Sequence, residues 1–172
     1  MAALAGAAGA PQRLGLAAAA AAAVIDQGVK LWLLYGFDLP GHGRVALTPF
    51  LDLVFVQNTG ISYGLFQGAG PLGQWVLFGF KAIAVLLLGL WLTRTPSRLA
   101  GLALGLIIGG ALGNAIDRGF YGAVVDYVLF HITAPTWTFE WYVFNLADAS
   151  IVAGVAGLLY ESLFAQGAAK AP

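Results

Sequence analysis

The sequence predicts an all-α integral membrane protein, with four transmembrane helices and a small extracytoplasmic β-sheet. Three observations predict this fold class. First, 60% of the 172 residues are hydrophobic and 9% are charged, whereas an average soluble domain has about 25% charged residues. Second, four apolar segments have roughly the 20 residues that a helix needs to cross a bilayer core. Third, two β-branched and aromatic segments lie in the links between these apolar runs.

The predicted spans are residues 14–37, 72–93, 99–116 and 146–164, in one membrane-embedded domain that covers residues 1–172. The first span also has features of a cleavable signal peptide, since it follows Arg13 and begins with a run of alanines. Its apolar stretch continues well beyond any cleavage point, through residues 31–34, and this continuation favours a retained helix.

Basic residues predict how the spans are oriented, because links rich in Lys and Arg stay in the cytoplasm. Arg94 and Arg98 flank the short link between the second and third spans, Arg13 precedes the first, and Lys170 follows the fourth. These regions fall on one side of the membrane. Both termini are therefore predicted to be cytoplasmic.

The two long links, residues 38–71 and 117–145, then face outward. Segments 45–57 and 122–132 within them are β-branched and aromatic and are interpreted as short strands. Open strand edges cannot face lipid, so we expect a small sheet at the outer surface. The two links do not match each other, which weakens an interpretation as an inverted-repeat transporter.

Composition excludes several functional classes. The formal net charge is zero, so the chain has no basic patch with which to bind nucleic acid. It has no cysteine, which removes disulfides, thiolate nucleophiles and cysteine-ligated metals. His42 and His131 are far apart in sequence, and their spacing does not suggest a metal site.

Charged residues within the predicted spans need partners. Asp26 and Lys30 are four residues apart, on one helical face, and are interpreted as a structural ion pair, with a proton relay as the alternative. Lys81 lies about ten residues into the second span. It either joins this pair or serves as the base of a Ser–Lys dyad, although no serine is obviously placed for the latter.

Two acidic residues stand in apolar surroundings near the predicted outer interface. Asp126 lies in the apolar strand VVDYVLF, and Asp148 lies at the start of the fourth span. An ionised carboxylate is costly in both settings. If the two met about 3 Å apart they would share one proton, and one would act as base on water while the other acts as acid, as in aspartic proteases. Their contact is a hypothesis at this point.

Two other functional classes use the same residues differently. In a small ion or solute transporter subunit, Asp126 and Asp148 would be ion ligands. In a noncatalytic membrane scaffold, their replacement by amides would have no effect.

Further polar residues cluster near the outer ends of the spans. Asn58 to Gly60 reads as a turn, and the alternative is that the Asn58 amide faces a substrate backbone. Asn114 and Arg118 lie at the outer end of the third span, where Asp117 and Arg118 are also interpreted as a loop-ordering pair.

Four stretches follow one another along the chain: DQGVK at 26–30, QNTGISYG at 57–64, GGALGNAIDRGFYGAVVDY at 109–127 and FNLADASIVAG at 144–154. Together they resemble the lipoprotein signal peptidase (signal peptidase II) family. They follow the family's order and cover nearly the whole chain except its ends. Family members often carry NxGAAF in the second stretch, where this chain has the bulkier Ile61, Ser62 and Tyr63. This difference bears on the shape of the pocket wall and not on the reaction.

The resemblance implies a bacterial inner-membrane endopeptidase that removes signal peptides from prolipoproteins, cleaving just before a diacylglyceryl-modified cysteine. The family's Asp dyad falls on Asp126 and Asp148. The residues that match the family's substrate-binding positions are Asn58, Gly60, Asn114, Arg118 and Asn145. The resemblance also implies a structural role for Asp26 and Lys30, contact with membrane lipids, inhibition by the cyclic peptide globomycin, and no metal or organic cofactor.

Overall fold

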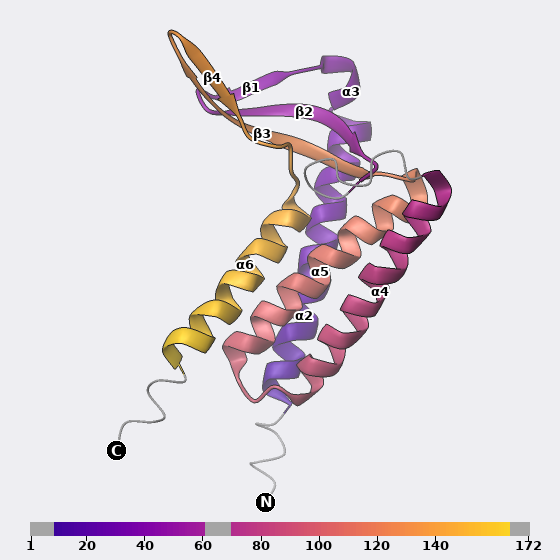
Figure 1. Ribbon diagram of the computed structural model, residues 1–172, viewed down its shortest axis with the longest axis vertical. Helices are drawn as coiled ribbons and strands as arrows, with labels where there is room; N and C mark the ends of the chain where they lie inside the picture. The colour runs from indigo at the N-terminus through magenta and orange to yellow at the C-terminus, as the bar shows by residue number, and fades with distance from the viewer. Residues whose placement is uncertain (1–8, 61–69, 166–172) are drawn as a thin grey trace, which may run out of the picture.

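The computed structural model describes residues 9–60 and 70–165 of the chain. In chain order the elements are α2 Ala10–Leu31, η1 Trp32–Gly36, α3 Leu39–His42, β1 Val45–Thr48, β2 Leu51–Asn58, α4 Gly70–Arg94, α5 Arg98–Tyr121, β3 Val124–Ala134, β4 Trp137–Glu140, α6 Leu146–Tyr160 and η3 Glu161–Ala165. The helices form a bundle, and the sheet stands at the end of the bundle opposite to the start of α2 and the end of η3 (Figure 1). The protein is thus mostly helical, with one small sheet.

Three helices among the described residues are long and apolar enough to cross a membrane. They are Ala10–Gly36, Arg98–Tyr121 and Leu146–Phe164, and they match the first, third and fourth predicted spans. The second predicted span falls on α4, a helix of 25 residues. Within α4, Ala82–Arg94 is a shorter apolar stretch. The structure therefore shows three candidate membrane helices, with α4 packed against one of them, α5.

Glycines on α5 allow its neighbours to pack at backbone distance. One face has a glycine at every fourth position, namely Gly101, Gly105, Gly109 and Gly113. A Cβ added at the first three would overlap the α2 backbone at Pro11, Gly15 and Ala19. On another face, a Cβ at Gly110 would overlap the α6 backbone at Ala147. Helices α2 and α6 are therefore held close to α5, as small residues permit in membrane proteins.

The sheet has four antiparallel strands in the order β1-β2-β3-β4. The prediction of one strand over 45–57 is wrong, since this segment is a hairpin of β1 and β2. Pro49 and Phe50 form its turn, and the Phe50 N–H donates to the Thr48 hydroxyl at 3.3 Å. The predicted strand at 122–132 corresponds to β3. Strand β4 was not predicted, because its four residues are all exposed and carry no burial pattern.

An apolar cluster fixes the sheet to the end of the bundle. Val125 and Tyr127 of β3 pack with Leu33 and Leu39, and all four are buried. Successive side chains of a strand point to opposite faces of the sheet. Asp126, which lies between the two packed residues, is therefore directed away from the cluster.

A row of charged side chains crosses the sheet. Arg44, just before β1, contacts Asp52 of β2 and Glu140 of β4. His131 of β3 lies 3.2 Å from the Asp52 carboxylate. Burial would raise the pKa of Asp52, but the hydrogen bond from Arg44 and the nearby His131 ring outweigh it and hold that pKa below its usual value. These four residues, here called the sheet cluster, link all four strands.

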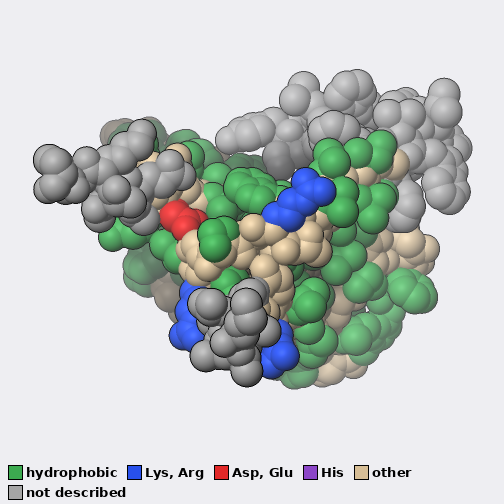
Figure 2. Space-filling model, turned by 90° about the horizontal axis from the view of Figure 1, so that it is seen from below, with side chains coloured by type: hydrophobic (Ala, Val, Ile, Leu, Met, Phe, Trp, Pro, Cys, Tyr) green, Lys and Arg blue, Asp and Glu red, His purple; other side chains and the backbone are tan. Residues whose placement is uncertain are grey.

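The opposite end of the bundle carries basic residues. Arg13, Arg94 and Arg98 are exposed there, and Figure 2, which views this end, shows Lys and Arg side chains among hydrophobic ones. The polar groups at the sheet end and these arginines are thus separated by the length of the helices.

Candidate active site

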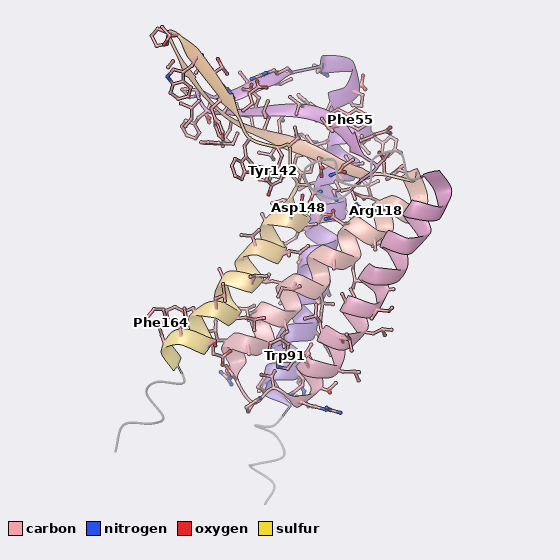
Figure 3. All side chains as sticks on the ribbon, viewed as in Figure 1. Phe55, Trp91, Arg118, Tyr142, Asp148 and Phe164 are labelled. Carbon is pink, nitrogen blue, oxygen red and sulfur yellow. The ribbon has the colours of Figure 1, made fainter. Side chains whose placement is uncertain are left out.

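Asp126 and Asp148 come from different elements and lie where the sheet meets the bundle. Asp126 belongs to β3 and is 2% exposed. Asp148 is in the first turn of α6 and is half-buried. Figure 3 shows Asp148 and Arg118 at this junction, with Tyr142 beside them and Trp91 and Phe164 towards the other end of the bundle.

The local sequence at the start of α6 orients Asp148. Asn145 is the N-cap, and its Oδ1 accepts the Asp148 backbone N–H at 2.9 Å. In return, Asp148 Oδ2 accepts the Asn145 backbone N–H at 3.2 Å. This reciprocal arrangement is a capping box, in which an acid at the third helical position closes the helix end. The FNLADAS stretch therefore ends a strand-like segment, starts α6 and fixes one acid.

Three asparagine amides donate hydrogen bonds to the two acids. Asn58 Nδ2 donates to Asp126 Oδ2 at 3.0 Å, and Asn145 Nδ2 donates to Asp126 Oδ1 at 2.6 Å. Asn114 Nδ2 donates to Asp148 Oδ1 at 2.9 Å. Asn145 thus contacts both acids, Asp126 through its side chain and Asp148 through its backbone. The structure joins the two predicted acids and three predicted amides in one hydrogen-bond network.

The environment of Asp126 disfavours its charged form. Burial raises the pKa of Asp126 to about 6; the Asp148 carboxylate adds to the rise, and the hydrogen bonds from Asn58 and Asn145 oppose it. A carboxyl group with a pKa in this range exchanges its proton near neutral pH. Such a group beside a second carboxylate is suited to general acid–base chemistry.

Arg118 ties the end of β2 to α5. Its Nη2 donates to the Gly60 carbonyl at 3.0 Å and its Nη1 to the Asn114 carbonyl at 3.2 Å. The predicted turn at 58–60 is present, since the Gly60 N–H donates to Asn58 Oδ1 at 3.1 Å. The Arg118 Nε is buried and has no hydrogen-bond partner among the described residues. One donor of this guanidinium therefore remains for a further group.

Asp26, Lys30 and Asp117 form a second polar group beneath the acids, here called the bundle cluster. Lys30 Nζ lies 2.8 Å from Asp26 Oδ2 and 2.6 Å from Asp117 Oδ2. All three residues are almost completely buried. Asp26 and Lys30 thus pair as expected from their spacing. Asp117 contacts Lys30 instead of the neighbouring Arg118, because consecutive helical residues point in different directions.

Gln27 and Asp117 contribute to the network, and sequence reasoning did not assign them to it. Gln27 Nε2 donates to Asp117 Oδ1 at 2.8 Å, and Asp117 Oδ2 accepts the Val125 N–H at 3.1 Å. The available signal was that Asp117 follows Asn114 by three residues, on the same helical face. The predictions for Ile61, Ser62, Tyr63 and the Lys81 side chain lie outside the part of the chain that the structure describes.

An apolar cavity of about 380 Å³ reaches Asp148 along α6. Its lining residues are Trp141, Tyr142, Phe144, Asp148, Ala149, Val152, Ala153 and Ala156. Asp148 is thus the acidic group at the end of an otherwise apolar and aromatic surface. Among the described residues, no group of three His, Asp or Glu side chains is arranged to hold a metal ion.

Comparison with known proteins identifies the family. The family model for signal peptidase (SPase) II matches residues 18–164. A lipoprotein signal peptidase of Rhodopseudomonas palustris is 56% identical over 162 residues, which is 94% of this chain and 99% of the relative. One of Nitrobacter hamburgensis is 58% identical over the same lengths. A bacterial membrane enzyme solved by the in meso method at 2.3 Å resolution has the same fold, with a TM-score of 0.74, 24% identity and 91% of both chains covered. The chain therefore belongs to the signal peptidase II family, and it is a protease of that family.

Proposed function

We propose that the protein is a membrane aspartic endopeptidase that removes the signal peptide from prolipoproteins, cleaving just before a diacylglyceryl-modified cysteine. The observation that carries the proposal is the hydrogen-bond network in which Asn145 links Asp126 with Asp148. The substrate class is taken from relatives named lipoprotein signal peptidase, which share more than half of their aligned residues with this chain.

In the proposed reaction, Asp126 and Asp148 share one proton. The ionised carboxylate removes a proton from water, and the water oxygen attacks the carbonyl carbon of the scissile peptide. The protonated carboxyl group gives its proton to the carbonyl oxygen. When the tetrahedral intermediate collapses, the C–N bond breaks, the cysteine nitrogen takes the proton that came from water, and a hydroxyl group of the intermediate returns its proton to the other carboxylate. The pKa of Asp126, raised to about 6, supports exchange of the shared proton close to neutral pH.

The other polar residues have distinct proposed roles. Asn58, Asn114 and Asn145 hold the carboxylates, and in doing so they line the substrate site. Arg118 holds the Gly60 segment, and its buried Nε, which has no hydrogen-bond partner within residues 9–60 and 70–165, is a donor for a substrate carbonyl. Globomycin-type cyclic peptides would inhibit the enzyme by occupying this same site.

The proposed topology has four membrane spans, including α4, with both termini in the cytoplasm of a bacterium and the acids at the outer face of the inner membrane. The exposed arginines at the end away from the sheet support it, because positive charge favours the cytoplasmic side. The length of α4, 25 residues, supports the fourth span. The apolar cavity along α6 supports access of a lipid-dissolved substrate to Asp148.

The test is cleavage of a lipidated prolipoprotein by the purified protein in detergent, with products identified by mass spectrometry. Asp126→Asn and Asp148→Asn are each expected to lose on the order of 10³-fold or more in turnover, and the double variant little beyond that, because members of a catalytic unit are non-additive. Asp52→Asn removes a carboxylate of the sheet cluster and is the matched control, expected to retain activity. Substantial cleavage by either folded single variant would exclude the dyad, and thermal melting checks folding.

A further inference from the structure

An asparagine side chain can direct either its oxygen or its NH₂ group at a neighbour, so something must fix its orientation. In Asn58 and in Asn145, a backbone N–H group fixes the orientation of the side-chain amide. The Gly60 N–H donates to Asn58 Oδ1, and the Asp148 N–H donates to Asn145 Oδ1. With their oxygens occupied, both amides direct NH₂ at Asp126. The backbone alone sets these two orientations.

Asn114 is oriented differently. Its Oδ1 accepts from Lys30 Nζ at 3.3 Å and from Asn145 Nδ2 at 3.1 Å, while its Nδ2 donates to Asp148 Oδ1. Both donors to this oxygen are side chains, among the residues that the structure describes. An ammonium group has three donors and no acceptor, so Lys30 can face only the oxygen of the amide.

Lys30 is itself held in place. Its ammonium contacts one carboxylate oxygen of Asp26 and one of Asp117. Asp26 Oδ1 accepts the Ala147 N–H at 3.0 Å, and Asp117 Oδ2 accepts the Val125 N–H at 3.1 Å. Each carboxylate is thereby anchored to the backbone of an element that carries a catalytic acid, α6 or β3. The ammonium is fixed relative to both acids.

We infer that Lys30 is a positioning residue for the proposed reaction: together with Asn145 Nδ2, it holds the Asn114 amide so that its NH₂ group donates to Asp148. This inference rests on the proposed function and gives the bundle cluster a role beyond packing. With the amide reversed, its oxygen would face the Asp148 carboxylate, and the ionised acid would lose a donor and meet a second acceptor. Loss of Lys30 therefore makes ionisation of Asp148 less favourable.

The charged groups near Asp148 determine how its ionisation responds when neighbouring charges are removed. They are Asp126 from β3, Asp117 and Arg118 from α5, and Asp26 and Lys30 from α2. Removing all charge from the bundle cluster removes two negative charges and one positive charge. Less negative charge nearby favours ionisation of Asp148, whereas loss of its amide donor opposes it. The two effects thus have opposite signs, and a titration separates them.

Lys30→Met alone would leave two buried carboxylates without a partner, so the test uses the neutral triple variant Asp26→Asn, Lys30→Met, Asp117→Asn. The Asn side chains keep the oxygens that accept from Ala147 and Val125. Asn114→Leu removes the amide directly. Leu104→Ala, a completely buried apolar side chain of α5, is the control that destabilises the bundle without touching the network.

The first measurement is an infrared titration of the carboxyl band that disappears in Asp148→Asn, which needs no activity. Its midpoint is expected to rise by about one pH unit in Asn114→Leu, and by less in the neutral triple variant, where the removal of negative charge opposes the rise. It should not rise further when the two are combined, and it should not change in Leu104→Ala. An unchanged or lowered midpoint in the neutral triple variant overturns the inference.

The second measurement is cleavage of a lipidated prolipoprotein, corrected for the folded fraction. The neutral triple variant is expected to lose about 10-fold or more in kcat, with little change in KM and with the acidic limb of the pH profile displaced upward. A kcat per folded molecule equal to that of Leu104→Ala would contradict positioning. If the titration shifts but the wild-type chain cleaves nothing, the proposed function fails and the positioning of Asp148 stands.

Discussion

The bundle cluster and the sheet cluster contain similar charges in different surroundings. Lys30 and its two carboxylates are sealed between helices, with side chains at most 2% exposed. The side chains of Arg44 and its partner Glu140 are 47% and 46% exposed. A charge left alone on the sheet can be solvated by water, whereas one left alone in the bundle cannot. The same type of ion pair is therefore expected to contribute more to stability in the bundle than on the sheet.

The largest loss of stability is expected when Lys30 of the bundle cluster is removed and its two carboxylate partners remain. Lys30→Met should lower the free energy of unfolding by about 3–5 kcal/mol, because two buried carboxylates lose their counter-ion. Thermal melting in detergent measures this loss. Adding Asp26→Asn and Asp117→Asn should recover part of it, since no buried charge remains. A Lys30→Met protein that melts with the wild type would show that water reaches the cluster.

A smaller, pH-dependent effect is expected from Asp126. Its pKa in the folded protein is about 6, above the ordinary value of 3.8. The stability that this raised pKa contributes is complete below about pH 4 and is lost as the pH rises through 6. At about 1.4 kcal/mol per pKa unit, the ionised acid costs the folded state about 3 kcal/mol at pH 8.

Asp126→Asn should therefore melt higher than the wild type at pH 8 and together with it at pH 4. Melting curves across this range check the prediction. A difference that does not depend on pH would mean that shape, and not charge, distinguishes the two side chains.

Replacement of arginine by lysine is expected to lower activity at Arg118 but not at Arg44 of the sheet cluster. Arg118 donates to the Gly60 and Asn114 carbonyls at once, which needs a planar fork. Arg118→Lys should lower kcat/KM by about 10-fold, while the protein still folds. Arg44→Lys in the sheet cluster is the matched exchange, expected to leave kcat/KM unchanged. Equal activity of both variants would show that charge alone suffices at Arg118.

The smallest effect is expected on the sheet. Glu140→Gln removes one exposed partner of Arg44, whose guanidinium remains in contact with Asp52. Tm should change by no more than about 2 °C, and this difference should vanish at high salt. A larger loss that persists at high salt would mean that the sheet cluster is shielded from solvent.

The parts of the fold that follow from bilayer thickness could be predicted from the sequence. The candidate helices Ala10–Gly36, Arg98–Tyr121 and Leu146–Phe164 appear as long apolar runs, because a span requires them. Strand β4 has four exposed residues, so burial leaves no pattern in its sequence. The β1–β2 hairpin depends on a turn at Pro49 within one continuous β-branched segment. Short exposed strands therefore remain beyond single-sequence reasoning.

Some residues of the candidate site could also be predicted from the sequence, whereas the contacts between them could not. Asp126 and Asp148 could be found because a carboxylate in apolar sequence is costly and needs a reason. Their connection through Asn145, and that of Lys30 with Asn114 across 84 positions, depends on how the elements fold together. Adjacency in sequence suggested Arg118 as the partner of Asp117, but in the folded protein Asp117 pairs with Lys30 of α2.

The glycines of α5 also decide which parts of the molecule can move. Where backbones touch, no side-chain rotamers lie between them to rearrange, so α2, α5 and α6 form a rigid frame. Helix α4 lacks such contacts where the structure describes them: a Cβ at Gly89 would meet nothing within 4 Å. To accommodate a substrate helix about 10 Å wide, one part of the protein must be displaced. That displacement is expected in α4, while the frame, together with the hydrogen bond from Asn145 to Asp126 of β3, keeps the geometry of the two acids constant from one turnover to the next.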